Sequence, residues 1–165
     1  MAIISYDDFS SLRERHPDKV IVFCSGSFDL CHAGHVLFFE DCKNLGDVLF
    51  VAVGSDKDIS GNKGPDRPVL NEHARLKIVD SLKPVDYSLI SNPTPPGAHH
   101  LAPIKELFER LRPDIWAVNA DASEIELRRE LAGNYGVCLV VLDRTAPPEY
   151  EGISTTSIIK KISGR

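Results

Sequence analysis

The stretch that decides the fold reads Gly26-Ser27-Phe28-Asp29-Leu30-Cys31-His32-Ala33-Gly34-His35. It follows an apolar run and precedes an amphipathic pattern, so it is expected to connect a strand to the N-terminus of a helix. Such a terminus carries free backbone N–H groups and the positive end of the helix dipole, and both attract anions. Two imidazoles at that position, His32 and His35, can bind a phosphate and stabilise charge that develops on it. The stretch therefore predicts a site of phosphate chemistry.

The same alternation of apolar and amphipathic segments continues along the chain. We expect strands at 19–24, 48–53, 87–90, 115–118 and 137–142, and helices at 6–15, 34–45, 71–82, 101–111, 123–134 and 155–162. Short apolar strands that alternate with helices predict a parallel sheet, and right-handed crossovers then place helices on both of its faces. The expected fold class is α/β, with residues 1–165 forming a single domain around a Rossmann-like doubly wound sheet.

Ligands of such a sheet bind beyond the carboxyl ends of the strands. Three loops rich in Gly and Pro are expected near that edge, at 54–68, 91–97 and 144–152. The first loop carries Lys63 and Arg67, and Arg75 lies on the helix that follows. Cations on a mobile loop suit a polyphosphate that is gripped and later released, whereas solvated surface charge is the alternative for each of them.

Composition limits the classes of function. The chain has 165 residues, 42% hydrophobic and 26% charged, which is typical of a globular protein. Its formal net charge of −5 argues against a nucleic-acid partner. We expect no membrane partner and a cytoplasmic location, because no apolar run approaches a membrane span and the first residues do not resemble a signal peptide. The four cysteines include no Cys-x-x-Cys pair, and three fall in apolar or helical patterns, as buried reduced thiols do.

The two histidines of the opening stretch have alternative interpretations. A structural zinc site at Cys31, His32 and His35 would need a fourth ligand, and no partner cluster of Cys or His is apparent, so no metal site is expected there. A histidine at a helix start can also simply cap the turn. Gly34 argues for the phosphate site, because glycine inside a helix costs about 1 kcal/mol relative to alanine and close approach of a ligand would explain it.

A second candidate anion site lies near the C-terminus. Ser154, Thr155 and Thr156 open the last expected helix, where hydroxyl and N–H groups can hold phosphate oxygens. Ordinary N-capping is the alternative for this segment taken alone. The chain has neither the spacing of a Walker loop nor a Gly-x-Gly-x-x-Gly motif, so a P-loop NTPase and a classical dinucleotide-binding protein are not favoured.

Two further features carry weaker predictions. His99 and His100 follow a Pro-rich loop; a double histidine can bind metal, but a surface loop is the favoured interpretation. Asp121 comes shortly after the strand that ends near residue 118. It can therefore contact a ribose or an acceptor substrate at the carboxyl edge of the sheet, or cap the helix that follows.

Two motifs taken together resemble those of the cytidylyltransferase-like nucleotidyltransferase superfamily: Gly26-x-Phe28-Asp29-Leu30-x-His32-x-Gly34-His35 and Ile153-Ser154-Thr155-Thr156-x-Ile158. The resemblance extends over about residues 20–162. The segment 51–56, leading to Lys63-Gly64-x-x-Arg67-Pro68, is similar to the heptose-phosphate adenylyltransferase branch. Arg144-Thr145 followed by 151–156 is similar to the glycerol-phosphate and ethanolamine-phosphate cytidylyltransferases, although 146–150 interrupts the match. An archaeal-type FAD synthase is a third branch.

The resemblance implies transfer of a nucleotidyl group from an NTP to a phosphorylated small molecule, with release of pyrophosphate. ATP is slightly favoured over CTP, Mg²⁺ is expected with the NTP, and a homodimer is implied. The expected catalytic residues are His32, His35 and Lys63. The expected nucleotide-binding residues are Ser27, Phe28, Gly34, Arg67, Ser154, Thr155 and Thr156. The expected acceptor-binding residues are Asp29, Asn119 and Asp121.

One segment departs from the family pattern. The chain reads Val118-Asn119-Ala120-Asp121-Ala122 where these families tend to carry a Gly-rich acidic turn, preceded in the heptose branch by a lysine at the position of Asn119. Ser27 also departs from the family pattern, but to a smaller extent. The larger departure bears on the identity of the acceptor substrate more than on the reaction itself. A nucleotide-binding sensor without catalytic activity is the non-enzymatic alternative.

Overall fold

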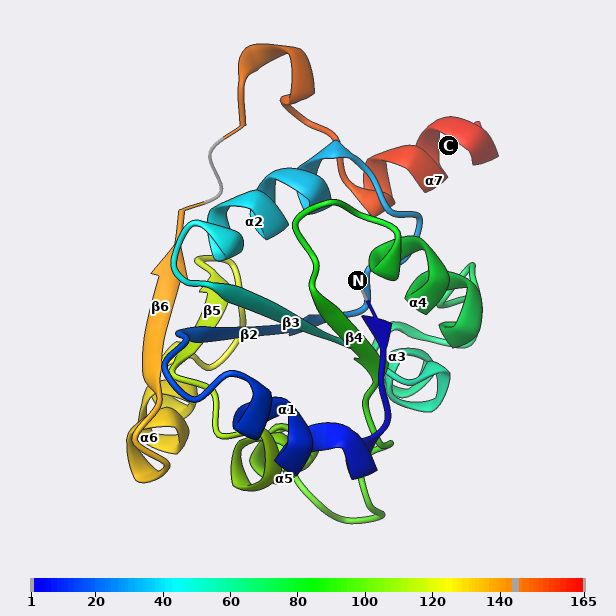
Figure 1. Ribbon diagram of the computed structural model, residues 1–165. Coiled ribbons are helices and arrows are strands. Elements are labelled where there is room, and N and C mark those ends of the chain that lie inside the picture. The colour runs from blue at the N-terminus through cyan, green and yellow to red at the C-terminus, as the bar shows by residue number, and fades with distance from the viewer. Residues whose placement is uncertain (1, 144–145, 165) are drawn as a thin grey trace.

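The computed structural model describes residues 2–143 and 146–164. Helices and strands alternate along most of this length (Figure 1). The strands are β1 (Ala2–Ile3), β2 (Ile21–Gly26), β3 (Val48–Val53), β4 (Tyr87–Ile90), β5 (Ile115–Asn119) and β6 (Cys138–Leu142). The helices are α1 (Phe9–Arg15), α2 (Ala33–Lys43), α3 (Asp56–Lys63), α4 (Glu72–Asp80), α5 (Ala102–Leu111), α6 (Ile125–Asn134) and α7 (Thr155–Ser163), with short 3₁₀ turns η1 (Tyr6–Asp8) and η2 (Pro148–Tyr150).

The strands form one six-stranded sheet in the order β1-β4-β3-β2-β5-β6, and all the pairings are parallel. The chain moves outward from β2 through β3 to β4, and then crosses back to place β5 on the other side of β2. Phe23 in β2 is thus aligned with Phe50 in β3 and with Trp116 in β5. The direction of winding reverses between β2 and β5, and such a reversal opens a crevice beyond the carboxyl ends of the two strands.

Both faces of the sheet are buried. Alternate residues of β2 and β3 contribute to two separate apolar clusters, with Phe23 and Phe50 in one and Val22 and Val51 in the other. Helices α1, α5 and α6 cover the first face, and α2 and α4 cover the second (Figure 1). A strand buried on both sides is apolar at every position, which explains the continuous run Val48–Val53. Each large side chain so buried contributes about 1.5–3 kcal/mol.

The α/β class and the doubly wound parallel sheet are confirmed, and the segments 48–53 and 87–90 match their strands. The loop expected at 54–68 is wrong, because most of it is helix α3. Ser55 starts this helix: its Oγ accepts a hydrogen bond from Asp58 N at 3.2 Å. Gly64, at φ 94°, ends it. Lys63 therefore lies on the last turn of a helix rather than on a mobile loop.

Smaller differences concern the edges of the sheet. Strand β1 pairs with β4 through only two residues, too few for a periodic pattern to reveal. Cys24 and Cys42 are buried, but Cys138 is exposed because it lies on the edge strand β6. Arg144 and Thr145, which the sequence comparison used, lie outside the described residues. Among the described residues, no helix combines the length and the apolar character needed to cross a bilayer.

Candidate active site

The two histidines of the opening motif lie side by side at the start of α2. His32 is the N-cap residue, in extended backbone conformation, and His35 is the third residue of the helix. Their rings are stacked, with centroids 4.0 Å apart and planes at 29°. The His32 N–H donates to Nδ1 of His35 over 3.4 Å. Two imidazoles are thus held together where the backbone N–H groups and the helix dipole already favour an anion.

Phe28 supports His35 from inside the fold. The centroid of its ring lies 5.6 Å from that of His35, in an edge-on arrangement, and 4.8 Å from that of Phe39. Phe28 is only 5% exposed. The sequence placed Phe28 among the nucleotide-binding residues, but its side chain belongs to the apolar core. The backbone of Phe28 has a left-handed φ of 47°, which turns the chain sharply after β2. The residue therefore shapes the loop that leads to the histidines.

Gly34 is required by the packing of His32. A Cβ on Gly34 would lie 3.1 Å from Cε1 and 3.2 Å from Nδ1 of the His32 ring. These distances are shorter than ordinary contacts, so any larger residue would push the ring away. The glycine in the motif is thus explained by the histidine beside it, in addition to the close ligand approach that the sequence suggested.

We expect Gly34→Ala to lower kcat by about tenfold or more while the protein stays folded, since a small displacement of a catalytic group has effects of this size. Gly133→Ala in α6 is the matched control, because no described atom lies within 4 Å of the Cβ it would add. That variant should be as stable as the parent or more stable by up to about 1 kcal/mol. Steady-state kinetics and urea unfolding check both. Equal kcat for the two variants would contradict this role of Gly34.

Asp29 organises the loop between the two candidate anion sites. Its carboxylate is 1% exposed and accepts hydrogen bonds from Val69 N at 2.9 Å and Leu70 N at 3.1 Å, and it pairs with Arg67 Nε at 2.9 Å. Burial alone would raise the pKa of Asp29, but these donors and the Arg67 charge outweigh it and lower that pKa. The sequence placed Asp29 among the acceptor-binding residues, whereas in the structure its carboxylate holds the loop in position.

Asp29→Asn should lower the free energy of unfolding by about 2–3 kcal/mol at pH 7, because a buried carboxylate that accepts several hydrogen bonds is lost. The folded protein holds the pKa of Asp29 below its ordinary 3.8. Its stabilisation is therefore complete above that pH and disappears as the pH falls through the folded pKa. Urea unfolding from pH 7 to pH 2.5 should show the gap between parent and variant closing only at the acid end. Asp66→Asn, at an exposed position, should leave the profile unchanged; a gap that does not vary with pH would refute the assignment.

The start of α7 is attached to the same loop. Ser154 is its N-cap residue, and its Oγ accepts from Ser157 N at 3.1 Å. Thr155 Oγ1 donates to the backbone oxygen of Asp29 at 2.7 Å. Thr156 is exposed. The two helix N-termini that the sequence marked separately, at α2 and α7, are therefore linked through the Asp29 loop.

Arg75 is buried and supports the other side of the loop that contains Asp29. It is 0% exposed. Its guanidinium donates to the backbone oxygens of Leu70 at 2.9 Å, Ser27 at 2.5 Å and Gly54 at 2.7 Å, and pairs with Asp56 at 2.7 Å. The expectation of a mobile or solvated cation is wrong for this residue. The charge of Arg75 gave no sign of this burial in the sequence, and the packing of α4 reveals it.

Lys63 and Ser27 stand together at the carboxyl end of β2. Lys63 Nζ donates to Ser27 Oγ at 3.1 Å. Burial lowers the pKa of Lys63, the charges of Arg67 and Arg75 lower it further, and Asp29 partly offsets this. Arg67 itself is paired with Asp29. Lys63 is therefore the member of the predicted cationic group whose ammonium reaches toward the crevice.

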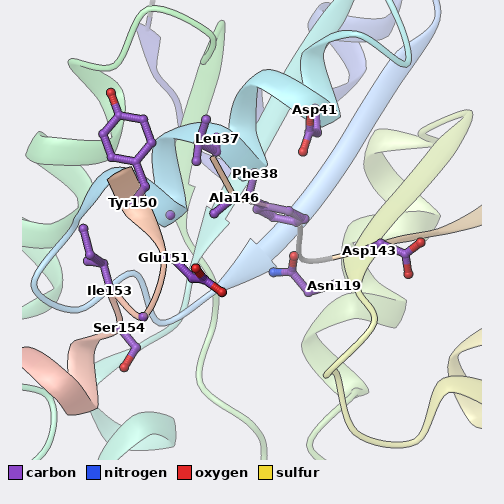
Figure 2. Close-up of a pocket in the computed structure, with 12 residues that line it drawn as sticks. Leu37, Phe38, Asp41, Asn119, Asp143, Ala146, Tyr150, Glu151, Ile153 and Ser154 are labelled. Atoms are coloured by element: carbon purple, nitrogen blue, oxygen red, sulfur yellow. The ribbon is translucent and has the colours of Figure 1, made fainter. Parts of the chain in front are cut away.

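Two pockets meet beyond the sheet edge. The larger has a volume of about 500 Å³ and lies between α2 and the segment before α7 (Figure 2). Helix α2 contributes Gly34, Leu37, Phe38 and Asp41, whose spacing places them on one helix face. The remaining described lining residues are Asn119, Asp143, Ala146 and 150–154.

The smaller pocket, of about 280 Å³, lies at the reversal between β2 and β5. Ser27, Lys63 and Asp121 line it, and Phe38 and Asn119 line both pockets. Asp121 thus lies at the carboxyl edge, as the sequence predicted, and Asn119 ends β5 at the same edge. The sequence did not mark Asp41, Asp143, Tyr150 or Glu151 as site residues.

Comparison with known proteins agrees with this geometry. The family model described as cytidylyltransferase-like matches residues 23–161. The chain belongs to this cytidylyltransferase-like family. It is therefore a nucleotidyltransferase, and the resemblance on which the sequence interpretation rested is confirmed.

Several individual proteins are similar to this chain. The bifunctional protein HldE of Syntrophotalea carbinolica is 35% identical over 153 residues, which are 92% of this chain and 29% of that protein. The chain thus spans under a third of the length of the curated relatives it matches. A lipopolysaccharide core biosynthesis protein from Thermoplasma volcanium is 26% identical, with a TM-score of 0.59 over 78% of this chain and 98% of that one. A pantoate-beta-alanine ligase from Francisella tularensis shares the fold, with a TM-score of 0.68 at 17% identity, over 100% of this chain and 78% of the ligase.

Proposed function

We propose that this nucleotidyltransferase transfers an adenylyl group from ATP to the phosphate of a sugar phosphate, heptose 1-phosphate, and releases pyrophosphate. The stacked His32–His35 pair at the start of α2, joined to the start of α7 through Asp29, carries the proposal. The similarity to HldE and to a lipopolysaccharide core biosynthesis protein supports a sugar-phosphate acceptor.

The reaction needs little covalent chemistry from the protein. An oxygen of the acceptor phosphate attacks the α-phosphorus of the NTP, the bond from that phosphorus to the bridging oxygen breaks, and pyrophosphate leaves with the bond electrons. The attacking phosphate is already an anion, so no serine or cysteine nucleophile is required. Catalysis then consists of positioning and of stabilising negative charge on the α- and β-phosphates.

The histidines supply that stabilisation. Nδ1 of His35 accepts from a backbone N–H, so its neutral ring carries the proton on Nε2 and presents a donor there. His32, stacked on it, adds a second imidazole at the same helix terminus. Thr155 uses its hydroxyl on Asp29 and Ser154 caps the N–H of Ser157, so the backbone N–H groups of Thr155 and Thr156 and the exposed hydroxyl of Thr156 would hold the departing pyrophosphate.

The two pockets suggest how the substrates divide. The larger is of nucleoside size, and polar groups of Asn119, Asp143 and Glu151 line it, as hydrogen-bonding of a base and ribose requires. The smaller pocket has Lys63 at one side and Asp121 at another, which suits a phosphate attached to a polyhydroxylated body. Asn119 and Phe38 lie at the junction of the two pockets, where the substrates would meet.

Mg²⁺ enters this scheme with the NTP as part of the substrate. Magnesium prefers oxygen ligands and keeps several waters, and one or two carboxylates beside substrate phosphates are enough to hold it. The described lining of the larger pocket offers such carboxylates at Asp41, Asp143 and Glu151. Bound to the triphosphate, the ion neutralises charge on the leaving pyrophosphate.

A cytidylyltransferase is the second candidate, because the segment Glu151–Ser154, similar to that branch, lines the larger pocket. One experiment separates the two. Pyrophosphate release is measured with Mg²⁺ for ATP and CTP, each crossed against heptose 1-phosphate, glycerol 3-phosphate, phosphoethanolamine and FMN. Turnover with ATP and heptose 1-phosphate is the expected result. Turnover only with CTP would assign the protein to the cytidylyltransferase branch. Nucleotide binding without turnover on any acceptor would indicate a nucleotide-binding sensor.

A further inference from the structure

A cluster of three metal-binding side chains lies outside the phosphate site. His99 and His100 precede α5, and Glu124 precedes α6. Nε2 of His99 lies 3.5 Å from Oε1 of Glu124, and Nε2 of His100 lies 3.1 Å from Oε2 of Glu124. One ligand atom from each of the three residues falls within 4.8 Å of the others. From this geometry we infer that His99, His100 and Glu124 bind a divalent transition-metal ion of the zinc type.

The distances fit one ion shared by the three groups. Ligand atoms about 2.0–2.1 Å from zinc at tetrahedral angles lie about 3.3 Å from one another. The two histidine-to-carboxylate distances, 3.1 and 3.5 Å, are close to this value but run to different oxygens of Glu124, so an ion between the rings would face both oxygens of the carboxylate. The same distances also fit hydrogen bonds from imidazole N–H groups to the carboxylate. A proton and a metal ion therefore compete for the same atoms.

Backbone features hold Glu124 and His99 in place before any ion arrives. Glu124 is the N-cap residue of α6 with a left-handed φ of 56°, an unfavourable conformation for a residue with a side chain. Nδ1 of His99 accepts from Leu101 N at 3.3 Å, which fixes that ring. Metal binding at Nε2 moves the ring proton to Nδ1 and gives up this long contact. The rings of His99 and His100 lie 4.3 Å apart, close enough to serve one ion.

A metal ion binds the neutral form of each imidazole. The neighbouring cation Arg128 lines the same pocket as His100. Arg128 donates its Nε to Ser123 O at 2.8 Å and lies over the Trp116 ring, so its guanidinium is directed to other partners.

The ligand set selects the class of ion. Two imidazoles and one carboxylate suit Zn²⁺, Co²⁺ or Ni²⁺, whereas Mg²⁺ prefers oxygen ligands alone. Three protein ligands leave at least one coordination position for water or a substrate oxygen. His100 also lines the smaller pocket, together with Asp121 and Arg128. An ion at this cluster would therefore lie at the rim of the pocket in which we place the acceptor, with an open position for one of its oxygens.

The test uses the full chain without a purification tag and reads metal occupancy rather than turnover, so it does not depend on the proposed reaction. Co²⁺ is titrated and followed by visible absorption, and Zn²⁺ binding is measured by calorimetry. We expect one saturable site per chain. His100→Ala and Glu124→Gln should each weaken binding about tenfold or more, since even changes to groups that only orient a ligand reach this size.

Matched controls make the result specific. His73→Ala in α4 and Glu126→Gln in α6 change exposed residues of the same types and should bind as the parent does. His32→Gln tests the competing cluster at the start of α2 and should also leave binding unchanged. Circular dichroism verifies that each variant is folded. Absence of saturable binding, or binding that survives the His100 and Glu124 substitutions but is lost in His32→Gln, would overturn the assignment.

Discussion

Substituting His35 by glutamine is expected to lower kcat by about 10²–10³, because removing one preorganised donor from the site where charge develops typically has that effect. The ring of His35 is held by His32 on one face and by Phe28 at its edge. Such a donor needs no rearrangement when charge builds up on the phosphate. Glutamine keeps a hydrogen-bonding group but loses both the stacking and the fixed direction of the Nε2 proton.

The measurement is the rate of pyrophosphate release under saturating substrates, together with KM for each. A charge-stabilising role predicts a fall in kcat with little change in the nucleotide KM, since the interaction is made mainly in the transition state. His73→Gln is the matched control, because His73 is exposed on α4. It should keep normal kinetics. If His35→Gln also kept near-normal kcat while unfolding as the parent does, the histidine pair would not be the catalytic group.

The part of this site that could be predicted from the sequence is the part built from local geometry. His32, Gly34 and His35 lie within one helical turn, so their spacing alone brings them together at the start of α2. The apolar runs Val48–Val53 and Tyr87–Ile90 likewise fixed their strands without knowledge of neighbours. In each case the residues that form the sequence pattern are the same few residues that form the structural element.

The part that escaped prediction depends on long-range packing. Arg75 is charged, and only its burial against three backbone carbonyls reveals that it is an internal support. Helix α3 contains Gly61 and has little apolar character, so its periodicity was too weak to recognise, although Ser55 and Asp56 carried an N-terminal signal. The larger pocket combines α2 with a segment about a hundred residues later, and no local pattern connects them.

These long-range contacts hold the loop that contains Asp29 from two sides. Asp29 fastens it to the segment 67–70 and to the start of α7, and Arg75 fastens it to the ends of β2 and β3. A phosphate site built from backbone N–H groups needs such support, because its donors cannot be positioned by side-chain packing. The stability of the domain and the geometry of its site therefore depend on the same two buried charges.

Arg75→Ala should consequently be the most destabilising of the substitutions considered, lowering the free energy of unfolding by about 3–5 kcal/mol. The change leaves the backbone oxygens of Ser27, Gly54 and Leu70 without the donors they now accept from, and each buried acceptor left unpaired costs about 1–3 kcal/mol. Arg75→Lys should recover only part of the loss, because one ammonium cannot reproduce the planar guanidinium that reaches these groups together.

Urea unfolding followed by circular dichroism provides the measurement, and Arg129→Ala provides the control. Arg129 is exposed on α6 and its side chain forms a 3.8 Å pair with Glu126, so its loss should change the free energy of unfolding by less than about 0.5 kcal/mol. If Arg75→Ala fell within the same range, the buried guanidinium would not be what holds the loop. If Arg75→Lys restored stability but not kcat, the exact direction of the Ser27 carbonyl would be the feature that catalysis requires, because that carbonyl lies in the turn between β2 and the histidines.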